Sequence, residues 1–345
     1  MFAMLRTHAQ GGTWTPVADM PSRRMDASMT SLRDGRVAIV GGGGSATGPT
    51  RSADLFDADA NKWTALPDMM LPRDSPGSCV LDSDGAKTLY AFGGTIAYPT
   101  PPSTLMNVTG SVEALTLGGH AEAKAWQHAA SLPSPRTSPS VASLSSGRAC
   151  VVAAGFDASQ SGFEYLQDAY LFDGSSYTKL PDLPFGRSNM AIVAAAGGVF
   201  VIGGGALDPS YYNVSYLQLQ PSVATAWKPM APLQAARSWT MAAALRDPQS
   251  GETRLVAAGG MSLQPFFEPM SSVEVYSTKN DSWTLFSDGD AGALPTPVGF
   301  GSGAAINATH MLAAGGAGPG TTGTEAFVFS LGTLRMALEE LPSVD

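Results

Sequence analysis

One unit of about fifty residues recurs along the whole chain, and this repetition limits the possible folds more than any other feature. Its most complete copy runs from Trp63 to Trp126. It contains a Trp followed by Leu-Pro, an Arg, an apolar run ending in Gly-Gly, a variable loop and another apolar segment. Successive Trp-type positions lie 49, 63, 51, 50 and 56 residues apart, and the differences fall in the loops. Insertions confined to connections are typical of a structural repeat.

Each copy offers four short segments rich in Val, Ile, Leu, Tyr and Phe. Asp34-Gly35 joins two such runs and predicts a hairpin. The chain has 39 Gly and 25 Pro but only 14% charged residues, which favours turns and short strands over solvated helices. A four-stranded sheet of this size cannot bury both faces alone, so the copies must stack around an axis. The sequence therefore predicts an all-β, six-bladed β-propeller.

The motif order supports this prediction through a resemblance. Gly-Gly after an apolar strand, a VEVY-type strand, Trp with Leu-Pro or Met-Pro, and then Arg resembles the kelch repeat of β-propellers. The resemblance implies a single propeller over residues 11–342. Its blades are expected at roughly 24–70, 73–133, 136–184, 187–233, 237–290 and 297–335 plus 11–20. The departures are Ala154-Gly155 for a glycine pair, Tyr177 for a Trp, and Thr296-Pro297-Val298 where the sixth Arg would stand.

Closure of the ring depends on an incomplete unit at residues 11–20. It holds a strand around Trp14 with no apolar strand leading into the Gly-Gly ahead of it. Kelch-type propellers are usually sealed by a terminal strand, so the resemblance implies that this strand completes the last blade. Residues 338–342 also match the Trp-x-x-Leu-Pro step, with Leu338 in the Trp place. We expect the Trp14 strand, because an aromatic ring fills the gap between blades better.

The conspicuous repeated residues have architectural explanations. Paired glycines allow backbone torsions closed to other residues and permit close approach of neighbouring chains. A Trp fills the space between two sheets. The recurring Arg suits a structural tie between sheets or to buried carbonyls. Function is therefore expected in the unequal loops between these residues.

The kelch resemblance implies a binding face formed by the loops after the Gly-Gly pairs and the loops around the recurring Arg. Exposed aromatic residues beside polar groups suit protein-binding hot spots and sugar-stacking platforms. Alternatively, each ring covers a blade edge. Two residues beyond each Arg, the ring around the channel mouth would present Asp26, Ser75, Ser138, Asn189 and Trp239. The predicted binding residues are Asp26, Tyr98, Phe156, Phe163, Tyr165, Asn189, Tyr211, Tyr212, Trp239, Phe266 and Phe267.

The inventory of reactive residues speaks against known kelch-like enzymes. Copper radical oxidases of this type need a Tyr/His/Cys constellation that the four His do not support. Iron-dependent specifier proteins carry Glu-x-x-x-Asp-x-x-x-His. Here Glu164 and Asp168 are followed by Phe172, so a ligand is missing. We assign no catalytic residue, metal or cofactor. The loop carboxylates that acid–base chemistry on a sugar would use are Asp157, Glu164, Asp168, Asp208 and Glu268.

We expect a non-catalytic scaffold that presents its loop face to a protein partner or a glycan, as a subunit of a larger assembly. The alternative is a carbohydrate-active kelch-like enzyme, of epimerase or lyase type. A deep polar pocket at the channel mouth with two carboxylates of perturbed pKa would favour the enzyme, whereas a flat aromatic face would favour the binding module. The net charge of −9 argues against nucleic acid, and no apolar run is long enough for membrane insertion.

Two features bear on the compartment. Four of the six Asn stand in Asn-x-Ser/Thr, where about one match is expected by chance. These candidate glycosylation sites are Asn107, Asn213, Asn280 and Asn307. They favour a secreted protein or one of the secretory-pathway lumen, with coincidence as the alternative. Cys79 and Cys150 each lie in an apolar run and are expected to be free buried thiols, with a disulfide as the alternative.

Overall fold

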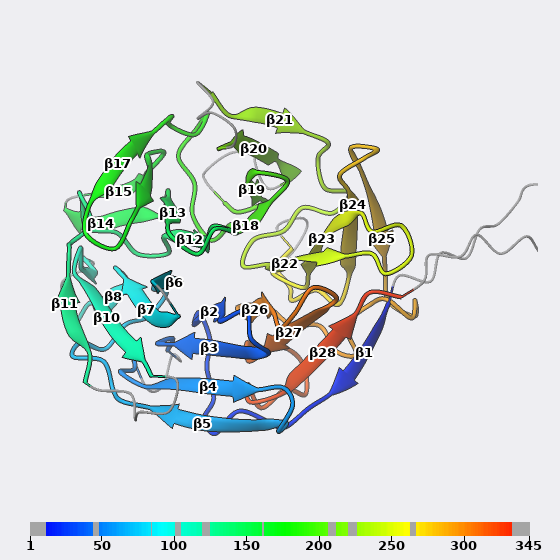
Figure 1. Ribbon diagram of the computed structural model, residues 1–345, viewed down its shortest axis with the longest axis horizontal. Coiled ribbons are helices and arrows are strands. Elements are labelled where there is room, and N and C mark those ends of the chain that lie inside the picture. The colour runs from blue at the N-terminus through cyan, green and yellow to red at the C-terminus, as the bar shows by residue number, and fades with distance from the viewer. Residues whose placement is uncertain are drawn as a thin grey trace, which may run out of the picture.

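The computed structural model describes residues 12–43, 48–83, 85–100, 105–118, 125–160, 162–205, 212–219, 226–262 and 267–332. Within these ranges the chain forms six four-stranded antiparallel sheets and two short hairpins, and it contains no α-helix. The sheets stand around a central axis like the blades of a propeller (Figure 1). The all-β, six-bladed propeller predicted from the repeat is confirmed.

The first three blades run outward from the axis in chain order, except for hairpins inserted in two loops. Blade 1 comprises β2 (Ser28–Ser31), β3 (Arg36–Val40), β4 (Ala53–Asp57) and β5 (Lys62–Leu66). Blade 2 comprises β6 (Gly77–Ser83), β7 (Ala86–Phe92), β10 (Val112–Leu117) and β11 (Gln127–Ala129), with the hairpin β8 (Thr95–Ala97) and β9 (Asn107–Val108). Blade 3 comprises β12 (Ser140–Ser143), β13 (Cys150–Ala153), β16 (Ala169–Phe172) and β17 (Tyr177–Leu180), with the hairpin β14 (Phe156–Gln160) and β15 (Gly162–Tyr165).

The last three blades repeat this order, with no inserted hairpin among their described residues. Blade 4 comprises β18 (Ala191–Ala195), β19 (Gly198–Ile202), β20 (Val214–Gln218) and β21 (Lys228–Met230). Blade 5 comprises β22 (Met241–Arg246), β23 (Thr253–Ala258), β24 (Val273–Ser277) and β25 (Ser282–Phe286). Blade 6 comprises β26 (Ser302–Ala305), β27 (His310–Ala314), β28 (Ala326–Ser330) and, from the N-terminus, β1 (Thr13–Pro16).

The N-terminal strand closes the ring, as predicted. β1 pairs antiparallel with β28 and places Trp14 opposite Phe329, with ring centroids 4.9 Å apart. Figure 1 shows β1, in blue, along the outer edge of the red β28. The competing segment around Leu338 lies outside the described residues. Closure of this kind joins the two ends of the chain through one sheet.

The repeated Trp has a role beyond filling space. The aromatic residue on or beside each outer strand donates a hydrogen bond to a carbonyl in the connection that leads into its own blade. The bonds are Trp63 to Ala18, Trp126 to Pro67, Tyr177 to Ala130, Trp227 to Pro181, Trp283 to Ala231 and Trp14 to Gly292, all between 2.7 and 3.1 Å. Tyr177 keeps this donor, which explains why a tyrosine replaces a tryptophan there. Leucine has no such donor.

Backbone hydrogen bonds join the glycine pair of one blade to the arginine of the next. The amide of each second glycine donates to the backbone carbonyl of the next blade's arginine, for example Gly94 to Arg136 at 2.9 Å. A Cβ on Gly94 would lie 2.8 Å from a backbone oxygen, and its φ is +97°, so only glycine fits. The first position of the pair has φ near 60°, which Ala154 adopts at 55°. In blade 6, Val298 supplies the carbonyl to Gly260 without an arginine side chain.

The five recurring arginines are buried ties, as expected from the sequence. Four of them pair with a carboxylate of their own blade: Arg24 with Asp54, Arg73 with Glu113, Arg136 with Asp168 and Arg237 with Glu274. Arg187 meets the Ser215 hydroxyl at 3.2 Å instead of a carboxylate, and burial lowers its pKa to about 10. All five arginines are therefore buried and hydrogen-bonded within their own blades.

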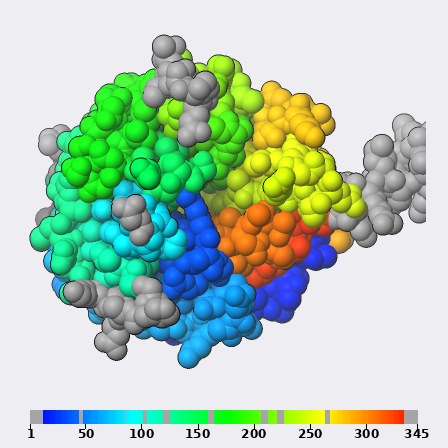
Figure 2. Space-filling model, viewed as in Figure 1, coloured from blue at the N-terminus to red at the C-terminus, as the bar shows by residue number. Residues whose placement is uncertain are grey.

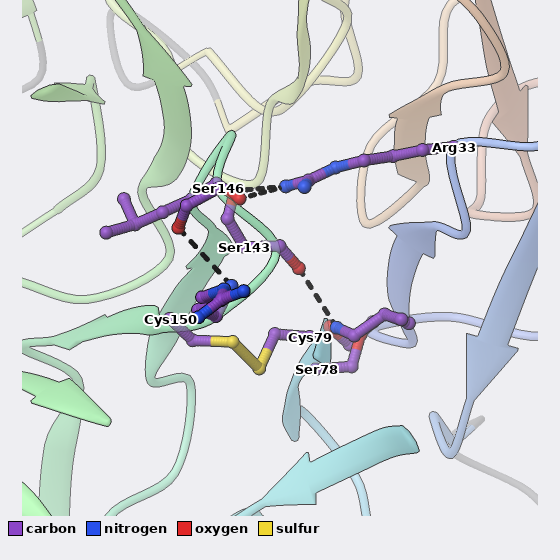
Figure 3. The surroundings of a disulfide bond; sticks show 10 residues. Arg33, Ser78, Cys79, Ser143, Ser146 and Cys150 are labelled. Carbon is purple, nitrogen blue, oxygen red and sulfur yellow. Dashed lines mark hydrogen bonds between the residues drawn. A yellow bond between two sulfur atoms is a disulfide. The ribbon is translucent and has the colours of Figure 1, made fainter. Parts of the chain in front are cut away.

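The expectation of free thiols was wrong: Cys79 and Cys150 form a disulfide between blades 2 and 3. Both residues are fully buried, and their Cα atoms are 6.5 Å apart (Figure 3). Their 71-residue separation hides this proximity, because only the packing of blade 2 against blade 3 brings the innermost strand β6 close to the second strand β13. Nearby, Val80 donates to Ser143 Oγ at 2.9 Å and strengthens the same seam.

Candidate ligand-binding site at the channel mouth

The two loop sets named from the sequence lie at the same end of the propeller. In every blade, an isolated antiparallel bridge joins the residue after the recurring Arg position to the residue after the glycine pair. The six bridges are Met25–Gly43, Asp74–Thr95, Thr137–Phe156, Ser188–Gly205, Ser238–Met261 and Gly299–Ala317. A bridge holds both backbones at hydrogen-bonding distance, so the loops form one continuous face.

A ring of six residues surrounds the channel at this face. Each lies two positions after the recurring Arg or its substitute and has a left-handed backbone with φ between 50° and 59°. They are Asp26, Ser75, Ser138, Asn189, Trp239 and Phe300. Four of the six neighbouring pairs are linked through the backbone, as where Ser75 N donates to Asp26 O at 3.0 Å and Ser138 N to Ser75 O at 2.8 Å. The ring is therefore a fixed frame for whatever its side chains contact.

Phe300 is the member that the sequence analysis missed, because blade 6 lacks the arginine used for counting. Counting from Val298 would have found it. A left-handed φ is uncommon for bulky residues, yet both Trp239 and Phe300 adopt one. Strain of about 1–3 kcal/mol at such a position is found mainly at functional sites. The two rings pack edge to face, with centroids 5.0 Å apart.

A hollow of about 320 Å³, here called the mouth pocket, opens beside this ring. Its aromatic wall consists of Tyr98, Phe156, Tyr165 and Trp239, and its acidic wall of Asp26 and Asp74. Serine and threonine hydroxyls supply most of the remainder. A second hollow of about 150 Å³ shares five ring residues with it and continues along the inner strands. The space-filling view shows the blades packed around a central hollow (Figure 2).

Three aromatic rings of blades 5 and 6 form a compact cluster at the same mouth. The centroid of Phe267 lies 5.6 Å from Trp239 and 6.1 Å from Phe300. Phe267 is 53% exposed, so one large apolar surface faces outward beside polar groups. Such a surface suits stacking against a ligand.

The surroundings of Asp26 and Asp74 favour the protonated form of both carboxyls. Burial raises the pKa of Asp74 to about 6, partly opposed by hydrogen bonds from the Tyr98 hydroxyl and the Ser75 amide. Burial also raises the pKa of Asp26 well above its usual range, and the charge of Asp74 adds to this, while a hydrogen bond from the Trp239 indole opposes it. Burial and the neighbouring Asp74 raise the pKa of Tyr98 as well. The charge of Asp74 acts on Asp26, so the two carboxyls are coupled, and ionisation of one disfavours ionisation of the other.

Asp74 was missed by the sequence analysis. A signal for it exists, since the residues that follow the Arg position in the six blades are Met25, Asp74, Thr137, Ser188, Ser238 and Gly299. Asp74 is the single charged member of that row. Among the residues that the structure describes, Oδ1 of Asp74 is a buried oxygen with no hydrogen-bond partner.

The predicted binding residues fall into three groups. The mouth pocket brings together Asp26, Tyr98, Phe156, Tyr165, Asn189 and Trp239, with Phe267 stacked beside Trp239. Tyr212 is 42% exposed but does not line this pocket, and Phe163 lies on β15. Tyr211 and Phe266 lie outside the described residues. The prediction of these residues as a binding face stays a prediction.

The loop carboxylates named for acid–base chemistry do not gather at the pocket. Asp168 forms a salt bridge with Arg136, and hydrogen bonds and the charge of that arginine lower its pKa despite the opposing effect of burial. Asp157, Glu164 and Glu268 are absent from the pocket lining, and Asp208 lies outside the described residues. In the described part of the chain, no three His, Cys, Asp or Glu residues are placed to hold a metal ion. Phe172, at the His position of the specifier motif, is a fully buried core residue.

Comparison with known proteins gives the fold and nothing finer. No protein-family model matches the chain, and no curated protein sequence matches it. Among solved structures, that of YjhT superimposes with a TM-score of 0.68 at 17% sequence identity, covering 91% of this chain and 95% of YjhT. At that identity the likeness shows a shared propeller architecture. No helix in the described part of the chain has the length and apolarity that crossing a membrane requires.

Proposed function

We propose that this protein is a non-catalytic binding propeller that holds a glycan in the mouth pocket. The observation that carries this proposal is the meeting of an aromatic cluster, paired acids and hydroxyls on one rigid ring. Sugars present both apolar ring faces and many hydroxyls, so they match a wall of aromatics beside hydrogen-bonding groups. The pocket volume of about 320 Å³ is at the small end of ligand sites and suits one or two sugar rings.

A concave site favours a glycan over a protein surface. Protein interfaces of ordinary size bury about 800 Å² on each partner. The exposed aromatics that could extend the site are separated: Phe267 packs against Trp239, which lines the pocket, whereas Tyr212 does not line it. The hollow at the channel mouth is therefore the better-formed recognition element.

The test is a glycan array followed by calorimetry on the binding glycans. Phe267→Ala should weaken binding by up to about tenfold, since an aromatic contact contributes about 0.5–1.5 kcal/mol. Tyr212→Ala is the matched control, because it removes another exposed aromatic ring that does not line the pocket, and it should leave the affinity unchanged. Equal losses in both variants, or no glycan bound at all, would contradict the proposal. If the Tyr212→Ala variant captured a protein from native material and the Phe267→Ala variant did not, the ligand would be a protein partner and not a glycan.

The enzyme alternative shares this pocket. Two carboxyls with a raised pKa at the channel mouth are a feature that favours an enzyme. Here these carboxyls are Asp26 and Asp74, and not the loop carboxylates predicted from the sequence. The calorimetric samples should therefore be analysed for chemical change. Glycan recovered unaltered supports a binding module, and conversion of the glycan would replace the proposal with an enzyme of epimerase or lyase type.

Kelch-repeat membership and a place in a larger assembly belong to the same proposal. The backbone bonds from glycine to arginine and the outer-strand aromatics support kelch ancestry, since each repeated residue makes the same structural contact from blade to blade. A rigid ring with one binding face suits a recognition subunit. Size-exclusion chromatography of native material, with this protein detected in a larger complex, is the corresponding measurement.

We also propose a secreted or secretory-lumen location. The buried disulfide supports an oxidising compartment. Asn107, Asn280 and Asn307 are exposed, and Asn213 is half-buried, so at least three of the four sequons are accessible to modification. A mass decrease on glycosidase treatment of native material is expected, and an unchanged mass would contradict glycosylation.

A further inference from the structure

Charge pairing in the described part of the chain singles out Asp74. The other buried carboxylates there, Asp54, Glu113, Asp247, Glu252 and Glu274, each form a salt bridge with an arginine. Asp74 is 92% buried and forms none. A buried carboxylate without a counter-ion is costly, and proteins generally pair such groups.

The nearest arginines in sequence cannot supply the missing charge. The guanidinium of Arg73 is 2.8 Å from Glu113, and that of Arg24 is paired with Asp54. Within the described residues, the lining of the mouth pocket contains no Lys, Arg or His. The titratable groups that face the pocket are therefore Asp26, Asp74, Tyr98 and Tyr165, and Glu268 follows Phe267 on the adjoining loop.

The pocket also has an unused hydrogen-bond acceptor. Oδ1 of Asp74 is buried with no partner, while the same carboxyl already accepts from Tyr98. A protonated primary amine offers three donors and no acceptor, so it complements such a site. The cluster around Trp239 adds an aromatic wall, against which a cation is further stabilised.

A metal ion fits these groups less well. Calcium takes six to eight oxygen ligands, and the described residues hold no group of three His, Cys, Asp or Glu placed around one point. An ammonium group needs fewer partners and tolerates the hydroxyls and aromatic rings that make up the rest of the wall.

We propose that the mouth pocket selects glycans that carry a free primary amine and places the ammonium group between Asp74 and Asp26. This inference rests on the proposed glycan-binding function and specifies its ligand as an amino sugar. A neutral or N-acetylated sugar can donate a hydroxyl or amide hydrogen bond to the Asp74 oxygen, but it would leave both acids without a counter-ion. Discrimination therefore comes from the buried acids, and general affinity comes from the aromatic rings.

The pH dependence of binding has a defined sign. With its pKa at about 6, Asp74 is largely protonated at pH 4.5 and loses its proton as the pH rises towards 7. The pKa of Asp26 is also raised, by burial and by the charge of Asp74. Ionisation creates the negative charge that attracts the amine. Affinity for the amino sugar should therefore increase from pH 4.5 to pH 6.5, while affinity for its N-acetylated counterpart should stay flat.

The experiment compares two tetrasaccharides with the same backbone, β-1,4-linked glucosamine and its fully N-acetylated form, by calorimetry on the full chain. At pH 6.5 the wild-type protein should bind the amine form at least tenfold more tightly, and Asp74→Asn should abolish that preference. Asp59→Asn is the matched control, because it removes one exposed carboxylate on the β4–β5 turn that does not line the pocket. Non-specific attraction of a cation to a chain of net charge −9 would fall equally in both variants and would overturn the inference.

The outcomes separate the two levels of the proposal. If both sugars bind equally and Asp74→Asn changes nothing, the amine inference is wrong and glycan binding stands. If neither these sugars nor any glycan on the array binds, the proposed function itself fails. If a lysine-containing peptide binds with the same dependence on Asp74, the ammonium belongs to a protein and the amino-sugar assignment is overturned. Should Asp74→Asn not fold, Asp26→Asn provides the same comparison.

Discussion

Asp74 should destabilise the folded protein at neutral pH, and its replacement by Asn should remove that penalty. Its pKa is raised from an ordinary 3.8 to about 6, so the folded state retains a proton that the unfolded state has lost. Unfolding stability therefore falls as pH rises through this window. A shift of about two pH units at 1.36 kcal/mol per unit corresponds to about 3 kcal/mol. The penalty is nearly complete above about pH 6.5 and small below about pH 4.

The assay is thermal or urea unfolding of wild type and Asp74→Asn at pH 4 and pH 7.5. With an unfolding entropy of about 2.1 cal/mol/K per residue over 345 residues, about 3 kcal/mol raises the melting temperature by about 4 °C at pH 7.5. At pH 4 the two proteins should melt together, because the wild-type carboxyl is then neutral like the amide.

A charge-matched control gives the opposite result. Asp54→Asn also removes one buried carboxylate, but it leaves Arg24 buried without its partner. That variant should lose about 3–5 kcal/mol at pH 7.5. The reasoning is refuted if Asp74→Asn destabilises the protein as Asp54→Asn does, or if its effect is the same at both pH values.

Three further predictions concern the stability of the propeller. Replacing Cys79 and Cys150 together by Ala should lower the free energy of unfolding by about 4 kcal/mol in urea, given the 71-residue loop that the disulfide closes; an unchanged midpoint would show that the bond does not stabilise the fold. Ser215→Glu should supply Arg187 with the carboxylate that most blades provide and raise stability by about 1.5–3 kcal/mol at pH 7, whereas a loss would show that blade 4 has no room for it. Trp14→Phe should keep the packing but lose the indole hydrogen bond, lowering stability by about 1 kcal/mol, and a melting curve identical to wild type would contradict that role.

The architecture was predictable because it is written in repeated residues. Gly-Gly, Arg and Trp recur at matching places, and each makes the same structural contact in nearly every blade, so their spacing reported the blade number and the closing strand. The disulfide could not be found in this way. Cys79 and Cys150 stand on non-equivalent strands, innermost and second, and only the packing of blade 2 against blade 3 brings them together.

The site could be predicted only in part from the sequence. Counting two residues beyond each Arg located most of the mouth ring, because that position has the same backbone conformation in every blade. Phe300 escaped because blade 6 lacks the arginine. Asp74 escaped because its importance depends on burial and on an absent counter-ion, and neither is visible in a sequence. Loop aromatics such as Tyr98 and Tyr212 look alike in sequence, yet only Tyr98 lines the pocket.

The most direct test is a crystal structure of the protein with the glucosamine tetrasaccharide bound at pH 6.5. The account predicts an amino group within hydrogen-bonding distance of Oδ1 of Asp74 and a sugar ring packed against the cluster of Trp239, Phe267 and Phe300. Sugar bound at the opposite end of the channel near Arg33, at a blade edge, or with its amine facing solvent would contradict it.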